Sequence, residues 1–215
     1  MAVGLLLWFW FSLPKKLFNA PTSYVIEDAD GNLLNATIAA DGQWRFPYNK
    51  NVPQKFIDCI TTFEDKRFFK HPGVDPVSIA RAVVKNIKNK GVVQGGSTIT
   101  MQVIRLSKKD DRRSIWNKLK ESILAVRLEM SYSKKEIIAL YASNAPFGSN
   151  VVGLDAAAWR YYGRSPDKLS WSEMATLAVL PNAPALVHPG KNRETLLKKR
   201  NILLDKLSAA GKINQ

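Results

Sequence analysis

The chain has 215 residues, a length that can bury one sizeable core and suggests one compact domain or at most two small ones. A hydrophobic content of 46% with 10% aromatic residues excludes a disordered chain. The formal net charge of +14 predicts an anionic partner, and charge alone leaves nucleic acid, a lipid headgroup surface and a phosphate-bearing substrate open.

The N-terminal segment, residues 1–14, is the most apolar part of the chain. It reads MAVGLLLWFWFSL before Pro14, and Lys15 and Lys16 follow. As a helix it would rise only about 20 Å, which is short of the ~30 Å hydrocarbon core of a bilayer. Aromatic residues next to a lysine pair are typical of the end of a membrane-spanning helix. We therefore expect a truncated transmembrane anchor, with a buried N-terminal helix as the alternative.

Residues 15–52 are predicted to be a linker that contains one β-hairpin. The stretch TSYVIEDADGNLLNATIA alternates apolar and polar residues on either side of a turn at Asp30 and Gly31. The following stretch, DGQWRFPYNKNVP, is rich in turn-forming residues and is interpreted as a connector.

Residues 53–215 show a helical pattern and are predicted to form one domain. The predicted helices are 53–65, 76–89, 98–107, 114–130, 134–143, 151–163, 171–180 and 193–209. Signals of a helix start precede three of them, namely Asp75-Pro76, Ser133-x-x-Glu136 and Ser170-x-x-Glu173. The sequence therefore predicts a mainly α fold with a small N-terminal β-hairpin.

The single cysteine, Cys59, excludes an intramolecular disulfide and a cysteine-based metal cluster. It lies in the first predicted helix, where Phe56, Ile57, Ile60 and Phe63 recur at helical spacing. A buried, inert thiol is expected.

The stretch TTFEDKRFFKHPGVD carries the first candidate for chemistry. Glu64 and Asp65 close a predicted amphipathic helix, and Phe68 follows. A carboxylate among aromatic side chains can have its pKa raised by desolvation, which suits a general acid or base. The alternative is a surface glutamate paired with Lys66 or Arg67.

The stretch GVVQGGSTITMQ carries the second candidate. Gly95 and Gly96 let the backbone approach a ligand closely, and Ser97 or Thr98 can cap the helix that follows. The first-turn N–H groups of that helix would then face an anion such as phosphate. A flexible turn is the alternative, and the Walker pattern with its lysine is absent from the sequence.

The predicted helix 114–130 carries the third candidate. One of its sides is apolar, formed by Ile115, Trp116, Leu119, Ile123, Val126 and Met130. Lys118 and Glu121 fall on a second side, together with Leu124, Ala125 and Leu128. A charged pair on an otherwise apolar or small face indicates either a helix ion pair or groups that line a cleft.

These stretches, followed by SKKEIIALY with NAPFG and by LAVLPNAP, stand in a characteristic order and spacing. From about Tyr24 to Leu207 the chain resembles the peptidoglycan glycosyltransferase domain, glycosyltransferase family 51, of class A penicillin-binding proteins. The stretches DGQWRFP, TMQ and NAPFG look most like the 1C branch of that family.

The resemblance implies a lysozyme-like α fold, anchored in the inner (cytoplasmic) membrane on its periplasmic side, that polymerises lipid II into glycan strands for the cell wall. Glu64 matches the general base of the family, and Glu121 matches a second catalytic position. The residues that match substrate-binding positions are Asp65, Phe68, His71, Gly96, Ser97, Thr98, Gln102, Arg105 and Lys118. Lipid II, the growing glycan strand and membrane lipids are the implied partners, and nucleic acid is not expected.

Attack by a sugar 4-hydroxyl on a lipid-linked donor requires proton removal and stabilisation of the departing undecaprenyl diphosphate. We assign the first task to Glu64, and the second to Lys118, Arg105 and the Ser97/Thr98 loop. Glu121 is expected to orient the donor or to hold a divalent cation, Mg²⁺ or Mn²⁺.

Four positions depart from the family pattern, namely Asn117 before Lys118, Met101 before Gln102, Ser143 after Tyr141-Ala142, and Lys199 before Arg200. The change at Asn117 removes one cation near the expected diphosphate, so activity is less directly implied than family membership.

Two other functions remain open from the sequence. Two-carboxylate chemistry on a lysozyme-like scaffold also fits a glycan-cleaving enzyme, and a basic, non-enzymatic module could bind a membrane surface. A transpeptidase is not expected, because SYSK and SPDK lack the partner motifs. Full-length relatives carry that activity downstream, so the chain resembles a fragment.

Overall fold

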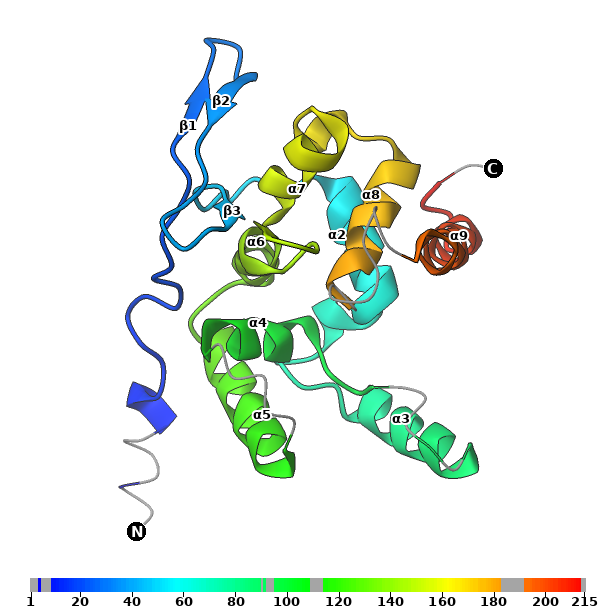
Figure 1. Cartoon of the computed structure of the whole chain (residues 1–215). Helices are drawn as coiled ribbons and strands as arrows, with labels where there is room; N and C mark the ends of the chain where they lie inside the picture. The colour runs from blue at the N-terminus through cyan, green and yellow to red at the C-terminus, as the bar shows by residue number, and fades with distance from the viewer. Residues whose placement is uncertain are drawn as a thin grey trace. The chain divides into compact units, whose positions relative to one another are not determined.

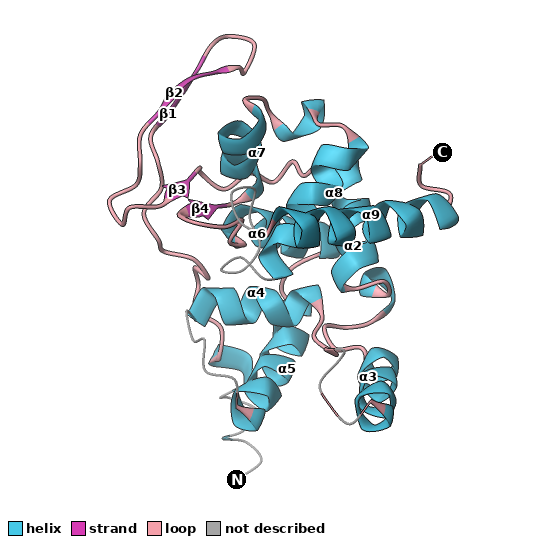
Figure 2. Cartoon of the chain, turned by 45° about the vertical axis from the view of Figure 1, so that its right-hand side comes forward, coloured by secondary structure: helices cyan, strands magenta, loops and turns pink. Residues whose placement is uncertain are grey.

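The computed structural model describes residues 4, 9–89, 91, 95–108, 114–182 and 192–213, and it is mainly helical (Figures 1 and 2). The helices are α2 Gln54–Glu64, α3 Pro76–Lys88, α4 Ile99–Lys108, α5 Ile115–Glu129, α6 Lys134–Asn144, α7 Leu154–Tyr162, α8 Trp171–Val179 and α9 Arg193–Ala209. The strands are β1 Val25–Glu27, β2 Leu33–Ala36, β3 Trp44–Arg45 and β4 Val151–Val152. Three short 3-10 helices complete the described elements, namely η1 Phe68–Lys70, η2 Pro166–Lys168 and η3 Leu180–Asn182.

The chain divides into two compact units. The first comprises Met1–Asn19 and Glu64–Ile137, and the second comprises Ala20–Phe63 and Ile138–Gln215. The first unit contains α3, α4 and α5, whereas the second contains the four strands, α7, α8 and α9. The domain boundaries at residues 14 and 52 stay predictions.

The predicted helices are all present, and their ends differ from the prediction by at most three residues. The largest difference is at α7, which begins at Leu154 because Val151 and Val152 pair in parallel with Trp44 and Arg45. The interpretation of DGQWRFP as a pure connector is therefore wrong at β3. A parallel pair of two-residue strands that lie so far apart in sequence leaves no local pattern to recognise.

The predicted start signals are confirmed by hydrogen bonds. The Asp75 side chain accepts from the backbone N–H of Val77 and caps α3, with Pro76 as the first helical residue. The Ser133 and Glu136 side chains accept from each other's backbone N–H groups at the start of α6. Both hydrogen bonds of a capping box are also present at the start of α8, between Ser170 and Glu173.

The predicted hairpin is confirmed as the antiparallel pair β1 and β2. In its turn, Asp28 Oδ1 accepts hydrogen bonds from the backbone N–H groups of Asp30 and Asn32, at 2.9 Å and 2.7 Å. Gly31 follows with a φ of +75°, a left-handed conformation that glycine adopts without strain.

The core of the second unit includes the buried face of α2. Phe56, Cys59 and Ile60 are fully buried, and the rings of Phe56 and Phe147 lie 6.3 Å apart. Burial raises the pKa of the Cys59 thiol to about 12, so the thiol stays protonated at neutral pH. The expected inert thiol is confirmed.

The core of the first unit is built around α4. Four of its apolar side chains, Ile99, Met101, Val103 and Ile104, are fully buried. α5 packs against α4 (Figure 2), and its buried residues are Leu124, Ala125 and Leu128. A helix buried on most sides is held in place by the surrounding core, so α4 is a rigid carrier for the polar side chains that it does expose.

No helix among the described residues is both long enough and apolar enough to cross a bilayer. Of the predicted anchor, residues 1–3 and 5–8 lie outside the described part of the chain.

Ser143, one of the four departures from the family pattern, takes part in a polar cluster of the second unit. Its Oγ accepts from the backbone N–H of Asn49 at 3.3 Å, and Asn49 Nδ2 donates to Asp155 Oδ1 at 3.1 Å. Burial raises the pKa of the Asp155 carboxyl. Ser143 is thus accounted for by its contact with the loop that positions Asn49.

Replacement of Asp155 by asparagine is expected to flatten the pH dependence of stability. Because the pKa of Asp155 is raised on folding, the folded protein loses stability as pH rises through that pKa, while the unfolded chain ionises more readily. The amide oxygen of the substituted side chain would keep the acceptor for Asn49 without the charge. Thermal unfolding from about pH 4 to about pH 8 should show a smaller loss of melting temperature for D155N than for the wild type. D205N, at an exposed position of α9, is the control, and an unchanged slope for D155N would contradict the prediction.

Candidate functional site

The carboxylate of Glu64 has a defined orientation. Glu64 is the last residue of α2, it is half-buried, and its Oε2 accepts a hydrogen bond from Gln102 Nε2 on α4 at 2.9 Å. Arg67, a neighbouring cation in the sequence, has its Nε 3.4 Å from Asp75 Oδ2. The hydrogen bond from Gln102 restricts the orientation of the Glu64 carboxylate. The side chain stays partly accessible to solvent, as a proton acceptor requires.

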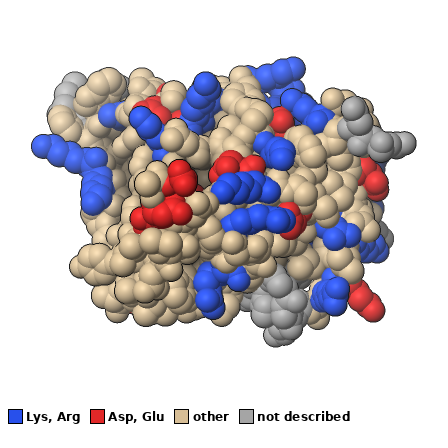
Figure 3. All heavy atoms as spheres, turned by 90° about the horizontal axis from the view of Figure 1, so that it is seen from above, with Lys and Arg blue, Asp and Glu red and all other residues tan. Residues whose placement is uncertain are grey.

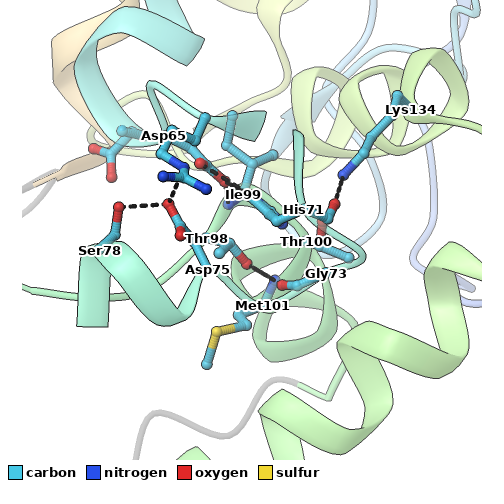
Figure 4. A network of polar contacts seen from close by, with 12 residues as sticks. Asp65, His71, Gly73, Asp75, Ser78, Thr98, Ile99, Thr100, Met101 and Lys134 are labelled. Carbon is cyan, nitrogen blue, oxygen red and sulfur yellow. Dashed lines mark hydrogen bonds and ion pairs between the residues drawn. The ribbon is translucent and has the colours of Figure 1, made fainter. Parts of the chain in front are cut away.

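Asp65 joins the end of α2 to the start of α4. Its two carboxylate oxygens each lie 3.1 Å from His71 Nε2, and Oδ2 also accepts the backbone N–H of Ile99 at 3.0 Å (Figure 4). Only 3% of the Asp65 side chain is exposed. Because Ile99 is the first residue of α4, Asp65 caps that helix from a distant part of the sequence. The same contact sets the position of Glu64, its neighbour in the chain.

Thr98 and Phe68 are also interior residues. Thr98 Oγ1 donates to the carbonyl of Gly73 at 2.6 Å and accepts from the backbone N–H of Met101 at 3.2 Å. Phe68 is fully buried, with its ring edge-on to those of Phe69 and His71. The interior of the first unit thus contains four of the predicted site residues, namely Asp65, Phe68, His71 and Thr98. Their burial favours a supporting role over direct contact with a ligand.

The glycine pair has a packing explanation. A Cβ at Gly96 would lie 3.1 Å from both Cα and Cγ1 of Ile79 on α3, whereas one at Gly95 would meet nothing within 4 Å. Gly96 therefore lets the loop lie against α3. The N–H groups of Ile99 and Met101 donate to Asp65 and Thr98, so these two donors of α4 are not available to an anion. The anion-binding interpretation of this helix start otherwise stays a prediction.

A second polar group lies between α4 and α5. Lys118 Nζ donates to Ser97 Oγ and to Glu121 Oε2, the latter at 3.2 Å. Burial lowers the pKa of Lys118, and the positive charge of Arg105 lowers it further against the opposing effect of Glu121. The side chain of Lys118 is 42% exposed and that of Glu121 is 13% exposed. The helix ion pair is therefore confirmed, and the interpretation that these groups line a cleft stays a prediction.

The opposite side of α5 faces outward. Ile115 is 89% exposed and Trp116 is 73% exposed, and Leu119 and Met130 are exposed as well. The sequence pattern predicted two sides for α5. The more apolar of these two sides is the one that is exposed in the first unit.

One face of α4 connects the two groups. Gln102, which contacts Glu64, and Arg105, which acts on Lys118, are three residues apart and so lie on the same side of the helix. Ser97, the partner of Lys118, stands just before the helix begins. The helix α4 thus provides the donor to Glu64 and carries Arg105, and the residue just before it, Ser97, contacts Lys118.

The described residues contain no cluster of three or more His, Cys, Asp or Glu side chains that could hold a metal ion. Glu121 instead contacts the Lys118 ammonium. Its expected alternative role as a metal ligand is therefore not supported by a set of partner ligands in the described parts of the chain.

The comparisons with known proteins identify the family of the chain. Residues 30–208 match a family model described as Transglycosylase. Penicillin-binding protein 1C of Escherichia coli (strain K12) is 39% identical over 199 residues, which cover 92% of this chain and 26% of the relative. Penicillin-binding protein 1A of Aquifex aeolicus (strain VF5) is 36% identical over 202 residues, or 93% of this chain and 28% of the relative.

A crystal structure of penicillin-binding protein 1A from Haemophilus influenzae aligns with 92% of this chain and 20% of that protein, at 22% identity and a TM-score of 0.47. The chain thus spans roughly a quarter of the length of the curated relatives that it matches. The match over most of its residues confirms the resemblance seen in the motifs, and the chain belongs to the transglycosylase family.

Proposed function

We propose that this chain is a peptidoglycan glycosyltransferase that polymerises lipid II into glycan strands. The observation that carries the proposal is that Gln102 on α4 donates to Glu64, while Ser97, just before α4, accepts from Lys118. A glycosyl transfer from a diphosphate donor needs a base and a stabilised leaving group. The first unit provides a candidate for each.

Glu64 is the proposed general base. It accepts the proton of the acceptor 4-hydroxyl while that oxygen bonds to the anomeric carbon of the donor. The bond from the anomeric carbon to the diphosphate oxygen breaks, and its electron pair leaves with undecaprenyl diphosphate. The hydrogen bond from Gln102 fixes one carboxylate oxygen, which limits the orientations that Glu64 can adopt before the proton is transferred.

Arg105 and Lys118 are the proposed partners of the leaving diphosphate. The positive charge of Arg105 contributes to the lowered pKa of Lys118, and two cations suit a group that bears two phosphates. Ser97 and Glu121 hold the Lys118 ammonium, so both act on the leaving group through that lysine. Asp65, Phe68, His71 and Thr98 are proposed to support the base from the interior.

Membrane lipids are a proposed partner, with the catalytic unit on the periplasmic side of the inner membrane. The apolar side chains of α3 that face outward are Val77, Ile79, Val83, Val84 and Ile87. The remaining surface of this helix carries Arg81, Lys85 and Lys88 and no acidic residue. Outward apolar residues beside a strip of cations are typical of a helix that lies in the headgroup region of anionic lipid.

The outward side of α5 extends this argument within the same unit. Ile115 and Trp116 are exposed near its start. Further along, the Arg127 guanidinium lies 4.8 Å from the Trp10 ring and donates to the Trp10 carbonyl. Exposed tryptophan beside basic residues is typical of a membrane interface.

One face of the molecule lacks the surface that nucleic acid requires. On the face seen in Figure 3, lysine and arginine side chains are interspersed with aspartate, glutamate and uncharged residues and form no unbroken basic surface there. A nucleic-acid site depends on a continuous basic footprint for the phosphate backbone.

Replacement of Glu64 by glutamine is expected to abolish polymerisation of lipid II, with a rate loss of at least about 100-fold, while the fold and the binding of a phosphoglycolipid inhibitor are retained. The substitution keeps the size of the side chain and removes the proton acceptor. E194Q, at an exposed position of α9, is the matched control. Normal polymer from E64Q would contradict the assignment, and strand cleavage of purified sacculi without polymer would favour a glycan-cleaving enzyme.

The pH profile is expected to report on Lys118. Its lowered pKa means that the ammonium loses its proton at a lower pH than an ordinary lysine, so activity should fall as pH rises. In K118R the guanidinium stays charged, and the alkaline fall should move to higher pH, although the maximum rate is lower. Initial rates from about pH 6 to about pH 10 measure this. K120R, on the exposed side of α5, should keep the wild-type profile, and a K118R profile equal to that of the wild type would contradict the role of Lys118.

The proposed lipid contact is tested by charge insertion on α3. Ile87→Glu should weaken binding to vesicles that contain anionic lipid about tenfold, because the apolar side chain no longer leaves water. The control is Ile202→Glu, since Ile202 is an exposed isoleucine on α9 in the second unit. Sedimentation with vesicles measures both variants, and equal binding by I87E and the wild type would contradict the contact.

A further inference from the structure

Lys134 has contacts that no part of the proposed mechanism uses. It is the first residue of α6, and its Nζ donates to the carbonyl of His71 at 2.6 Å and to Glu129 Oε1 at 2.7 Å. The same nitrogen lies 4.3 Å from the centre of the Phe68 ring. A backbone carbonyl, a carboxylate and an aromatic face are all favourable partners for an ammonium.

Glu129 links Lys134 to α4. Its Oε1 also accepts from Thr100 Oγ1 at 2.6 Å, and Thr100 is a fully buried residue of α4, two positions before Gln102. The side chain of Glu129 is 9% exposed and that of Lys134 is 22% exposed. Little water can compete with these interactions, so they are stronger than those of a surface pair.

The chain of contacts has a local origin in the sequence. The turn between α5 and α6 is closed by the N–H groups of Ser131 and Tyr132, which both donate to the carbonyl of Leu128. The capping box of Ser133 then starts α6 at once. Glu129 and Lys134 therefore stand on the two sides of one tight turn. Glu129 accepts from Thr100 on α4, and Lys134 donates to the His71 carbonyl in the loop after Glu64 (Figure 4 shows Lys134).

The loop between Glu64 and α3 is thereby held at two places. Asp65 fixes its beginning to Ile99 and to the His71 ring, and Lys134 fixes the His71 backbone. Glu64 precedes this loop directly, and its partner Gln102 lies on the helix that both contacts reach. A loop restrained at both positions has fewer orientations available to it than one restrained only at Asp65.

We propose that Lys134, together with Glu129, is a positioning residue that sets the alignment of Glu64 with Gln102. It acts through the His71 carbonyl and the Phe68 ring on one side and through Thr100 on the other. This inference rests on the proposed function of Glu64 as the base.

The variant K134M tests the proposal, because methionine keeps an apolar stem for Phe68 and removes the ammonium. We expect kcat for lipid II polymerisation to fall about 10- to 100-fold, as a small misplacement of a catalytic group would cause. KM and the binding of a phosphoglycolipid inhibitor should stay close to wild type, because Ser97, Arg105 and Lys118 make no contact with Lys134 among those described. K134R, which can still donate to both oxygens, should recover part of kcat.

Loss of stability must be separated from loss of alignment. K134M leaves the Glu129 carboxylate buried without its cation, which destabilises the fold. The double variant K134M/E129Q removes both charges, and the new amide oxygen at position 129 can still accept from Thr100. We expect its melting temperature to return toward wild type while kcat stays low, because the donor to His71 is still missing.

The matched control is K135M, at the exposed neighbouring lysine of the same helix, which should keep wild-type kcat. Wild-type kcat in K134M, or recovery of kcat together with the melting temperature in the double variant, would overturn the inference. A raised KM with unchanged kcat would also overturn it, since it would place Lys134 in direct contact with substrate. These results are distinguishable from failure of the proposed function, in which E64Q itself would remain active.

Discussion

The hydrogen bond from the Ile99 N–H to Asp65 is the contact on which the candidate site depends. It joins the residue that follows Glu64 to the first residue of α4, and so it relates the proposed base to every polar side chain that α4 carries. A buried carboxylate that accepts a backbone N–H at a helix start is favoured both by the hydrogen bond and by the helix dipole. His71 shares this carboxylate, which brings the loop before α3 into the same arrangement.

The two sides of α5 lie in different environments, one packed against α4 and one exposed. Its inner side carries Lys118 and Glu121 next to residues buried against α4, and its outer side exposes Ile115 and Trp116. In a protein surrounded only by water this distribution would be unfavourable, because apolar residues would be in the solvent while charges faced the packed side. In a protein that acts on a lipid-linked donor at a bilayer, both sides have a physical reason. In the proposed function, the charged side would meet the diphosphate and the apolar side would meet the lipid.

Much of the helical framework could be predicted from the sequence, because caps and apolar spacing are local signals. Asp75, Ser133 and Ser170 each marked a helix start that the structure contains. The short pair of β3 and β4 could not be predicted, since its stability comes from partners distant in sequence. For α5, the pattern separated two sides, but which of them is covered depends on the neighbouring helices. For the site, the resemblance indicated Glu64 and Lys118, whereas the roles of Lys134, Glu129 and Thr100 have no sequence signal, because their contacts form only in the folded first unit.

The half-buried state of Lys118 has a consequence for binding energetics. Part of the hydration that an ammonium loses on meeting a phosphate has already been replaced by Ser97 and Glu121 during folding, while 42% of the Lys118 side chain stays exposed. That part of the unfavourable free energy of dehydrating the cation belongs to the stability of the protein and is not subtracted again from the affinity for the proposed donor.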